Sequence, residues 1–304
     1  MKKKTLLITT ALMAVTMFAG VLGGCSKDTS TNKDATKTED TKKEEPEKEE
    51  VKYSGSITAA GSSALQQLVD EIGKKFMAAN PDCTVNVQGG GSGVGVNQVA
   101  EGSIQIGNSD VPSKEKIKDA AKAGELVDTK ICAQSFAVVV NKDNKVADLT
   151  KEQIAKIFSG EYKNWKEVGG DDVAIEVINR PATSGTRAVF TKTIMGSVAV
   201  KEDLGTAQDS SGTVVTAVEG SKGAISYLGS AYVTSDKKIK ALKLAGVEGT
   251  VANIANEKYP FWSYGYMVTK GEPAKEIKGF IDFLMKDTET IKKMGYIPMS
   301  ELKK

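Results

Sequence analysis

Short strand-like runs alternate with helical patterns from Ser56 onward, and this alternation limits the folds open to the chain. Residues 56–60 lead through a Gly-Ser-Ser turn into 64–72, where apolar positions 65, 68, 69 and 72 form one helix face. The strand-like run 84–88 opens into a glycine-rich turn and a helical pattern to about Glu101, and a further strand follows at 104–109. This repetition predicts an α/β fold with a largely parallel sheet.

The chain has 304 residues, which exceeds what one hydrophobic core usually supports, so we expect two lobes. Two apolar runs indicate where the chain crosses between them. Residues 136–140 predict a crossing into a second lobe, and the aromatic run 259–268 predicts the return. We therefore expect lobe 1 at 53–134 plus 257–304 and lobe 2 at 135–256. Lobe 2 should contain a helix at 151–158 and a strand at 173–178. From Lys275 toward Lys304 we expect one amphipathic helix, packed on lobe 1.

The N-terminal segment has the pattern of an export signal. Three lysines at 2–4 precede an uncharged run that is too short for a spanning helix, so 1–24 is predicted to be a signal peptide. Its end, Leu22-Gly23-Gly24-Cys25, resembles the bacterial lipobox, which predicts acylation of Cys25 and attachment to the outer face of the cell membrane. An ordinary signal peptide with an incidental cysteine is the alternative. The charged, proline-containing segment 25–52 is predicted to be a disordered tether.

The composition excludes several classes of function. The chain has no histidine, which removes Ser-His-Asp and Cys-His catalysis and histidine metal sites. Neither nucleotide-binding glycine motif occurs and no carboxylate cluster has metal spacing, so we expect no cofactor or metal. The aromatic set at 259–266 lacks interleaved basic residues, which argues against nucleic-acid binding. Cys83 and Cys132 could form a disulfide, although two small buried residues are the preferred interpretation.

Three turns between a strand and a helix could hold a small anion: Gly61-Ser62-Ser63, Gly91-Ser92-Gly93 and Thr183-Ser184-Gly185-Thr186. Helix N-termini offer unpaired N–H groups and a positive dipole end, and hydroxyls add donors. Any single serine or threonine here could instead be an ordinary N-cap. The chain's only arginines, Arg180 and Arg187, flank the third turn. A guanidinium fork matches two anion oxygens, which predicts a binding role for Arg180, whereas Arg187 could simply form a salt bridge.

Asp110 stands out because a carboxylate beside a bound anion costs Coulomb energy unless the ligand donates a proton to it. Hydrogen phosphate ions carry such a proton near neutral pH and sulfate does not, so Asp110 would favour phosphate over sulfate. The alternative is that Asp110 caps a helix that begins near Pro112. The local sequence supports both roles.

At these residues the chain resembles the PstS family, the phosphate-binding lipoproteins of bacterial phosphate ABC importers. The motifs are Ala60–Ser63, Gln88–Gly93, Gly107–Asp110, Phe158–Gly160 with Asn164-Trp165, and Arg180–Thr186. The resemblance implies a two-lobed type II periplasmic-binding-protein fold with a hinge between the lobes. It also implies a phosphate-binding set of Ser62, Ser63, Ala64, Ser92, Asp110, Arg180, Ser184, Gly185 and Thr186. Ala64 and Ala182 stand where better-known members have a large aromatic and an acidic residue.

Together these observations predict a monomeric, lipid-anchored receptor that binds inorganic phosphate between its lobes and delivers it to an ABC permease. It would not be an enzyme. The nearest alternative is the same fold with another oxyanion, such as sulfate or molybdate, or an organic phosphate. Two further alternatives are a surface sensor or adhesin, and a secreted hydrolase that uses Ser92 or Ser184 as its nucleophile. The hydrolase would need a base to activate the serine, and none of the three turns contains a lysine.

Overall fold

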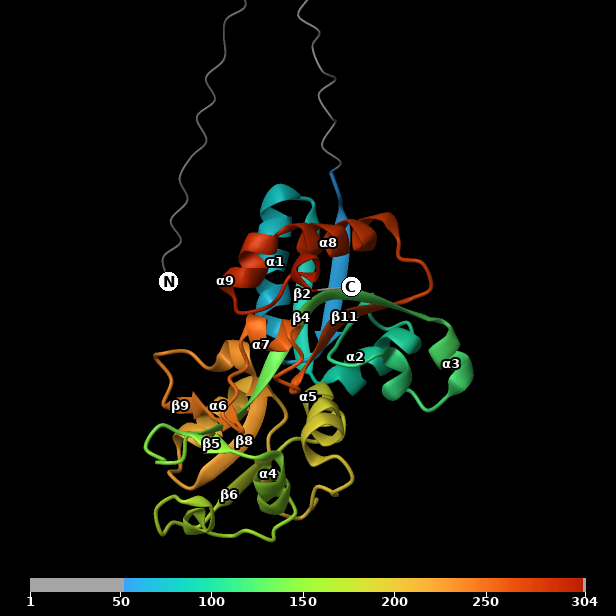
Figure 1. Cartoon of the computed structure of the whole chain (residues 1–304). Coiled ribbons are helices and arrows are strands. Elements are labelled where there is room, and N and C mark those ends of the chain that lie inside the picture. Colours follow the sequence, from blue (N-terminus) through green and yellow to red (C-terminus); the bar gives the residue numbers. More distant parts are fainter. Residues whose placement is uncertain (1–51, 303–304) are drawn as a thin grey trace, which may run out of the picture. The chain divides into compact units, whose positions relative to one another are not determined.

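The computed structural model describes residues 52–302 (Figure 1). These residues belong to one compact unit, Glu50–Lys304. The predicted signal peptide, the lipidation site Cys25 and all of the predicted tether except Lys52 lie outside the described residues. Among the helices of 52–302, none has the length and apolar content needed to cross a bilayer.

A mixed sheet of nine strands organises the fold, in the order β2-β1-β3-β11-β4-β8-β6-β7, with β9 paired to β4. Its strands are β1 Gly55–Gly61, β2 Cys83–Gly90, β3 Ile106–Ser109, β4 Leu126–Asn141, β6 Glu176–Asn179, β7 Thr206–Ala207, β8 Ala224–Gly229, β9 Ile239–Ala241 and β11 Trp262–Lys270. The outer pairs, such as β1 with β2 and β6 with β8, are parallel, whereas β4 and β11 run antiparallel to their neighbours. A separate parallel pair joins β5 Asp148–Leu149 to β10 Lys243–Leu244.

The helices follow the strands as the sequence pattern predicts. They are α1 Gln66–Ala79, α2 Ser92–Ala100, α3 Ala120–Gly124, α4 Lys151–Phe158, α5 Gly185–Phe190, α6 Ser211–Glu219, α7 Val251–Ala255, α8 Lys275–Lys286 and α9 Thr288–Lys293. Helix α4 has the predicted bounds because Thr150 and Gln153 form a capping box at its start. Its end is set by Gly160, whose φ of 79° is a left-handed conformation that favours glycine.

The prediction of a single helix from Lys275 toward Lys304 is wrong. Helix α8 ends at Lys286, and Asp287 leaves the helical conformation with ψ of 63°. The Asp287 side chain then accepts a hydrogen bond from the Thr290 N–H at 3.0 Å and so caps the separate helix α9. Helix α8 still packs where expected, because Phe280 meets Phe76 of α1 with ring centroids 5.3 Å apart.

Strand β4 runs through both parts of the sheet, and Figure 1 shows it beside β11. Up to Ser135 its residues pair with β11, and from Phe136 they pair with β8. This change of partner falls where the sequence predicts the crossing between lobes. The residue boundaries proposed for the two lobes stay a prediction.

Separate hydrophobic clusters stabilise the two ends of the sheet. One contains Ile57, Leu68, Phe76, Met267 and Phe280, all from 53–134 or 257–304. Another contains Val139, Val214 and Leu228, all from 135–256. A third, larger cluster includes residues from both sets, among them Ala64, Phe136 and Phe261. Cys83 and Cys132 are buried and free, so the preferred interpretation of both as small buried residues is confirmed.

Candidate functional site

The three turns singled out in the sequence do connect strands to helices, and the structure brings them together. The first joins β1 to α1, the second β2 to α2 and the third β6 to α5. The Gly91 N–H donates to the Gly61 carbonyl at 2.8 Å, which links the second turn to the first. The Gly93 N–H donates to the Thr183 carbonyl at 2.9 Å, which links the second turn to the third. Segments far apart in the chain thus form one polar site.

Asp110 lies at the centre of this site and is only 1% exposed. One carboxylate oxygen, Oδ1, accepts hydrogen bonds from the Ser62 hydroxyl and, at 2.9 Å, from the Gln134 side-chain amide. The other, Oδ2, accepts from the Thr186 hydroxyl at 3.0 Å. Burial raises the pKa of Asp110, and these three hydrogen bonds and the charge of Arg180 oppose that rise. The predicted alternative, a capping role at the helix after Pro112, is absent, since the 3₁₀ turn Ser113–Glu115 that follows Pro112 has no side-chain cap.

Gly185 lets the third turn approach the second turn and Asp110. A Cβ atom at Gly185 would lie 2.1 Å from the Ser92 hydroxyl oxygen and 2.8 Å from Oδ2 of Asp110, distances that real Cβ atoms do not reach. The Ser92 hydroxyl itself accepts a hydrogen bond from the Asp110 N–H at 3.0 Å. A glycine is therefore required for this packing.

Arg180 is the second buried charge and is also 1% exposed. Its Nε donates to the Gln208 carbonyl at 2.8 Å, and its Nη2 donates to the Asp209 carbonyl at 3.1 Å and to the Ser63 hydroxyl at 3.2 Å. Main-chain carbonyls and the Ser63 hydroxyl thus orient the guanidinium. Burial lowers the pKa of Arg180, but a guanidinium stays protonated in proteins.

The predicted residues Ser63, Ala64 and Ser184 are also buried. The Ser63 hydroxyl accepts from the Ser211 N–H at 3.0 Å, and the Ala64 N–H donates to the Ser62 hydroxyl at 3.2 Å. Ser184 is the N-cap of α5, because its hydroxyl accepts from the Arg187 N–H at 3.1 Å. The N-cap alternative is therefore correct for Ser184. Arg187 forms an ion pair with Glu202, as its alternative interpretation supposed, and also donates to the Arg180 carbonyl at 2.8 Å.

Sequence reasoning missed residues that the fold brings to Asp110 and Arg180. Gln134 comes from the middle of β4, where nothing in the local sequence marks it as part of a site. Ser211 opens α6 beside Ser63, and the run Ser210-Ser211-Gly212 is a fourth serine-glycine helix start that the same motif search could have found. Lys116 reaches the third turn, with its Nζ 2.9 Å from the Ser184 carbonyl oxygen.

Several buried polar atoms of the site have no hydrogen-bond partner among residues 52–302. They are Nη1 of Arg180, Oε1 of Gln134 and both side-chain polar atoms of Asn108. Among residues 52–302, the other buried side-chain atom without a hydrogen-bond partner is Oε1 of Gln98 in α2. Unpaired buried donors and acceptors are costly, so they indicate a place where a polar ligand would bind.

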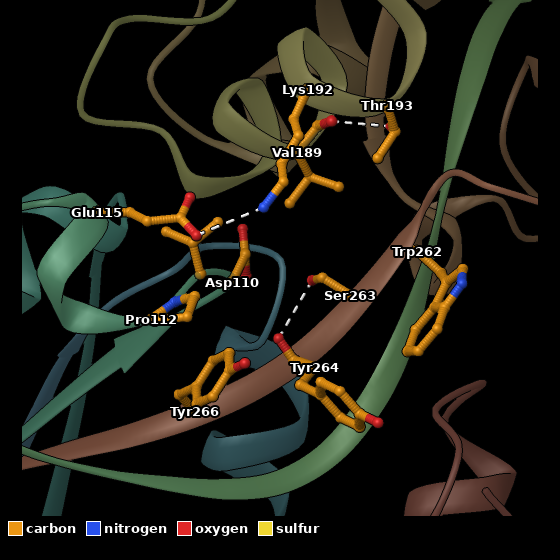
Figure 2. A pocket seen from close by; sticks show the side chains of 11 residues that line it. Asp110, Pro112, Glu115, Val189, Lys192, Thr193, Trp262, Ser263, Tyr264 and Tyr266 are labelled. Carbon is orange, nitrogen blue, oxygen red and sulfur yellow. Dashed lines mark hydrogen bonds and ion pairs between the residues drawn. The ribbon is translucent and has the colours of Figure 1, made fainter. Parts of the chain in front are cut away.

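A cavity of about 250 Å³ lies next to Asp110. Figure 2 shows Trp262, Tyr264 and Tyr266 of β11 along one side and Lys192 with Glu115 across the opening. Lys192 Nζ lies 3.7 Å from Glu115 Oε1. Of the aromatic residues predicted to serve strand packing, Tyr259 and Phe261 are buried away from this cavity, whereas the buried Tyr266 and the half-buried Trp262 and Tyr264 line it.

Comparison with known proteins agrees with this architecture. A family model described as a PBP superfamily domain matches residues 34–288. The phosphate-binding protein PstS of Bacillus subtilis (strain 168) is 41% identical over 308 residues, which cover 100% of this chain and 97% of the relative. PstS of Staphylococcus saprophyticus is 29% identical over 244 residues, covering 77% of this chain and 76% of the relative.

Two solved structures are similar. A phosphate ABC transporter substrate-binding protein from Clostridium perfringens, determined with bound phosphate, has a TM-score of 0.72 and 30% identity, covering 81% of this chain and 100% of the other. An ABC-type phosphate transport receptor from Vibrio cholerae has a TM-score of 0.62 and 29% identity, covering 79% and 99%.

The fold and the enclosed polar site define the class, a two-lobed binding protein of the PBP superfamily with the type II arrangement. Identity over the whole length narrows this class to one family. The chain belongs to the PstS family of phosphate-binding proteins.

Proposed function

We propose that this protein captures inorganic phosphate between its two lobes, outside the cytoplasm, and delivers it to an ABC permease. The ligand would be held by the residues carried over from the family, Ser62, Ser63, Ala64, Ser92, Asp110, Arg180, Ser184, Gly185 and Thr186. Hinge bending would close the lobes around it. The relatives at high coverage are named phosphate-binding proteins, which supports both the ligand and a binding rather than catalytic role.

The coordination of Asp110 is the observation that carries the choice of phosphate. A carboxylate offers about four acceptor positions, and three are filled here by Ser62, Gln134 and Thr186. The remaining position on Oδ2 would accept a hydrogen bond from the O–H group of a hydrogen phosphate ion. Sulfate has no proton to donate near neutral pH, so it would meet an uncompensated negative charge.

Arg180 supports binding of a negatively charged ligand. Its Nε and Nη2 groups are fixed by neighbouring carbonyls and Ser63, while Nη1 has no partner among residues 52–302. A donor that is buried and already oriented binds an anion without further ordering of its side chain. With the helix N-termini of the three turns, Arg180 would balance the ligand's charge.

Isothermal titration with phosphate, sulfate and molybdate tests this function. We expect phosphate to bind with one site per chain, and sulfate and molybdate to bind far more weakly. Tight binding of sulfate or molybdate in the absence of heat from phosphate would show that the assignment is wrong.

The hydrolase alternative has little support from the geometry. The Ser92 hydroxyl accepts from the Asp110 N–H, and the Ser184 hydroxyl caps α5. The ammonium that reaches the third turn, that of Lys116, binds the main-chain oxygen of Ser184. No general base is thus placed on either hydroxyl by these contacts. We expect no product release from a chromogenic phosphate ester.

Anchoring belongs to the same proposal. The lipobox-like sequence that ends at Cys25 would provide acyl chains, and 26–52 would separate the membrane from the folded body. A monomer anchored in this way could reach a permease in the same membrane. We propose this arrangement for the extracytoplasmic face of the cell membrane.

A further inference from the structure

Three successive carbonyl groups, those of Ala182 and of Thr183 and Ser184 at the start of the third turn, accept hydrogen bonds from two residues of 53–134. Lys116 Nζ donates to the Ala182 oxygen at 3.1 Å and to the Ser184 oxygen at 2.9 Å. The Gly93 N–H donates to the intervening Thr183 oxygen at 2.9 Å. On the proposed boundaries these bonds connect lobe 1 to lobe 2.

The bond to Ser184 also determines where the next N–H points. In a trans peptide the carbonyl and the following N–H point in opposite directions. When Lys116 holds the Ser184 oxygen, the Gly185 N–H must therefore point away from Lys116. Gly185 is the first residue of α5, so its N–H has no intrahelical partner and belongs to the proposed phosphate-binding set.

We propose that Lys116 is a positioning residue that fastens the third turn in the closed form and orients the Gly185 N–H toward the bound anion. This inference rests on the proposed phosphate-binding function, because the anion is what the Gly185 N–H would contact. Lys116 does not itself touch the ligand in this account.

The environment of Lys116 supports a specific role. The side chain is half-buried, whereas Lys114 and Lys118 on either side are exposed. Burial lowers the pKa of Lys116, and the negative charge of Asp110 opposes that change. The neighbouring pair of Glu115 and Lys192 joins the same two proposed lobes beyond the end of α5, but its charged atoms are 3.7 Å apart and the Lys192 side chain is 73% exposed. Such exposed pairs contribute little, so Lys116 provides the stronger connection.

The experiment compares the full mature protein with Lys116→Met and Lys118→Met, which remove the same charge at a half-buried and at an exposed position. Methionine keeps the apolar stem and removes the donors. Stopped-flow measurements should show phosphate release at least about tenfold faster in Lys116→Met, because the charge-assisted hydrogen bonds to Ala182 and Ser184 are both lost, with association nearly unchanged. Lys118→Met should release phosphate at the wild-type rate. Release at the wild-type rate from Lys116→Met would overturn the proposal.

Amide exchange at Gly93 without ligand provides a second readout, independent of phosphate. The Gly93 N–H bonds to Thr183 across the same contact, so we expect Lys116→Met to increase its exchange and Lys118→Met to leave it unchanged. If wild-type protein failed to bind phosphate, the proposed function would be wrong, and the Gly93 exchange would still decide whether Lys116 fastens the turn. Equal exchange in all three proteins would show that it does not.

Discussion

Thr186 donates a hydrogen bond from its hydroxyl to Oδ2 of Asp110 at 3.0 Å, although the two residues are 76 positions apart in the chain. Thr186 lies in α5 and Asp110 directly follows β3. On the proposed boundaries the bond therefore joins lobe 2 to lobe 1 at the point where the ligand would bind. Asp110 would contact the ligand and the closing lobe at once, so changes at this residue should affect both selectivity and stability.

Asp110→Asn should weaken phosphate binding more than sulfate binding. The substitution removes a charged acceptor for the ligand's proton, which costs about 1.5 to 3 kcal/mol, or roughly ten- to a hundredfold in Kd. Sulfate would lose a repulsion and should not bind more weakly. Calorimetric titration of both anions measures this, with Asp282→Asn, in an exposed pair with Lys278, as the control. Equal losses for the two anions would remove the selectivity argument.

Arg180→Lys should weaken phosphate binding by about 2 kcal/mol, or roughly thirtyfold, because an ammonium cannot reproduce the fixed fork. The same change at Arg187, which pairs with Glu202 at the edge of the turn, should have a much smaller effect. Titration calorimetry gives both affinities, and thermal melts establish that both variants fold. Similar losses for the two variants would argue against a special role for Arg180.

Gly185→Ala should prevent the third turn from reaching Ser92 and Asp110, since the added Cβ would lie 2.1 Å from the Ser92 hydroxyl oxygen. Because the lobes could still remain apart, we expect phosphate binding to fall at least tenfold with a smaller change in the Tm of the ligand-free protein. Gly124→Ala is the control: nothing lies within 4 Å of its added Cβ, and alanine favours the helix. Undiminished binding by Gly185→Ala would contradict the packing described above.

The raised pKa of Asp110 predicts a specific pH dependence of stability. Burial makes the folded-state pKa higher than the ordinary value of 3.8, so the folded protein binds more protons than the unfolded chain between these two values. The contribution of Asp110 to the free energy of unfolding is greatest below pH 3.8 and decreases as pH rises toward the folded-state pKa. Urea unfolding at a series of pH values measures it as the wild-type value minus that of Asp110→Asn. A difference that increased with pH would reverse the predicted sign.

Cys25→Ser should release the protein from the membrane fraction without changing phosphate affinity, because the proposed acyl chains would be lost while the site residues stay the same. Cell fractionation followed by titration of the released protein tests both parts. Release of the wild type and Cys25→Ser alike would favour an ordinary signal peptide with an incidental cysteine, and retention of both in the membrane fraction would show that Cys25 is not the point of attachment.

The sequence determined the local parts of the site because they depend on nearby residues. Helix α4 has its predicted bounds since Thr150 and Gln153, which cap it, are three residues apart. The turns at Ser62, Ser92 and Ser184 were recognisable because glycine and serine between a strand and a helix have a local meaning. The isolated pair Arg180 and Arg187 marked the third turn in the same way.

Only the tertiary structure decided which groups those residues meet. Gln134 reaches Asp110 because β4 passes beside the site. Arg180 is oriented by the Gln208 and Asp209 carbonyls. The spacing of these residues in the sequence does not indicate either contact. The break at Asp287 was missed because an aspartate within an amphipathic pattern can continue one helix or begin another. Caps and turns depend on a few adjacent residues, whereas contacts across the chain depend on sheet order and on the packing of separate lobes.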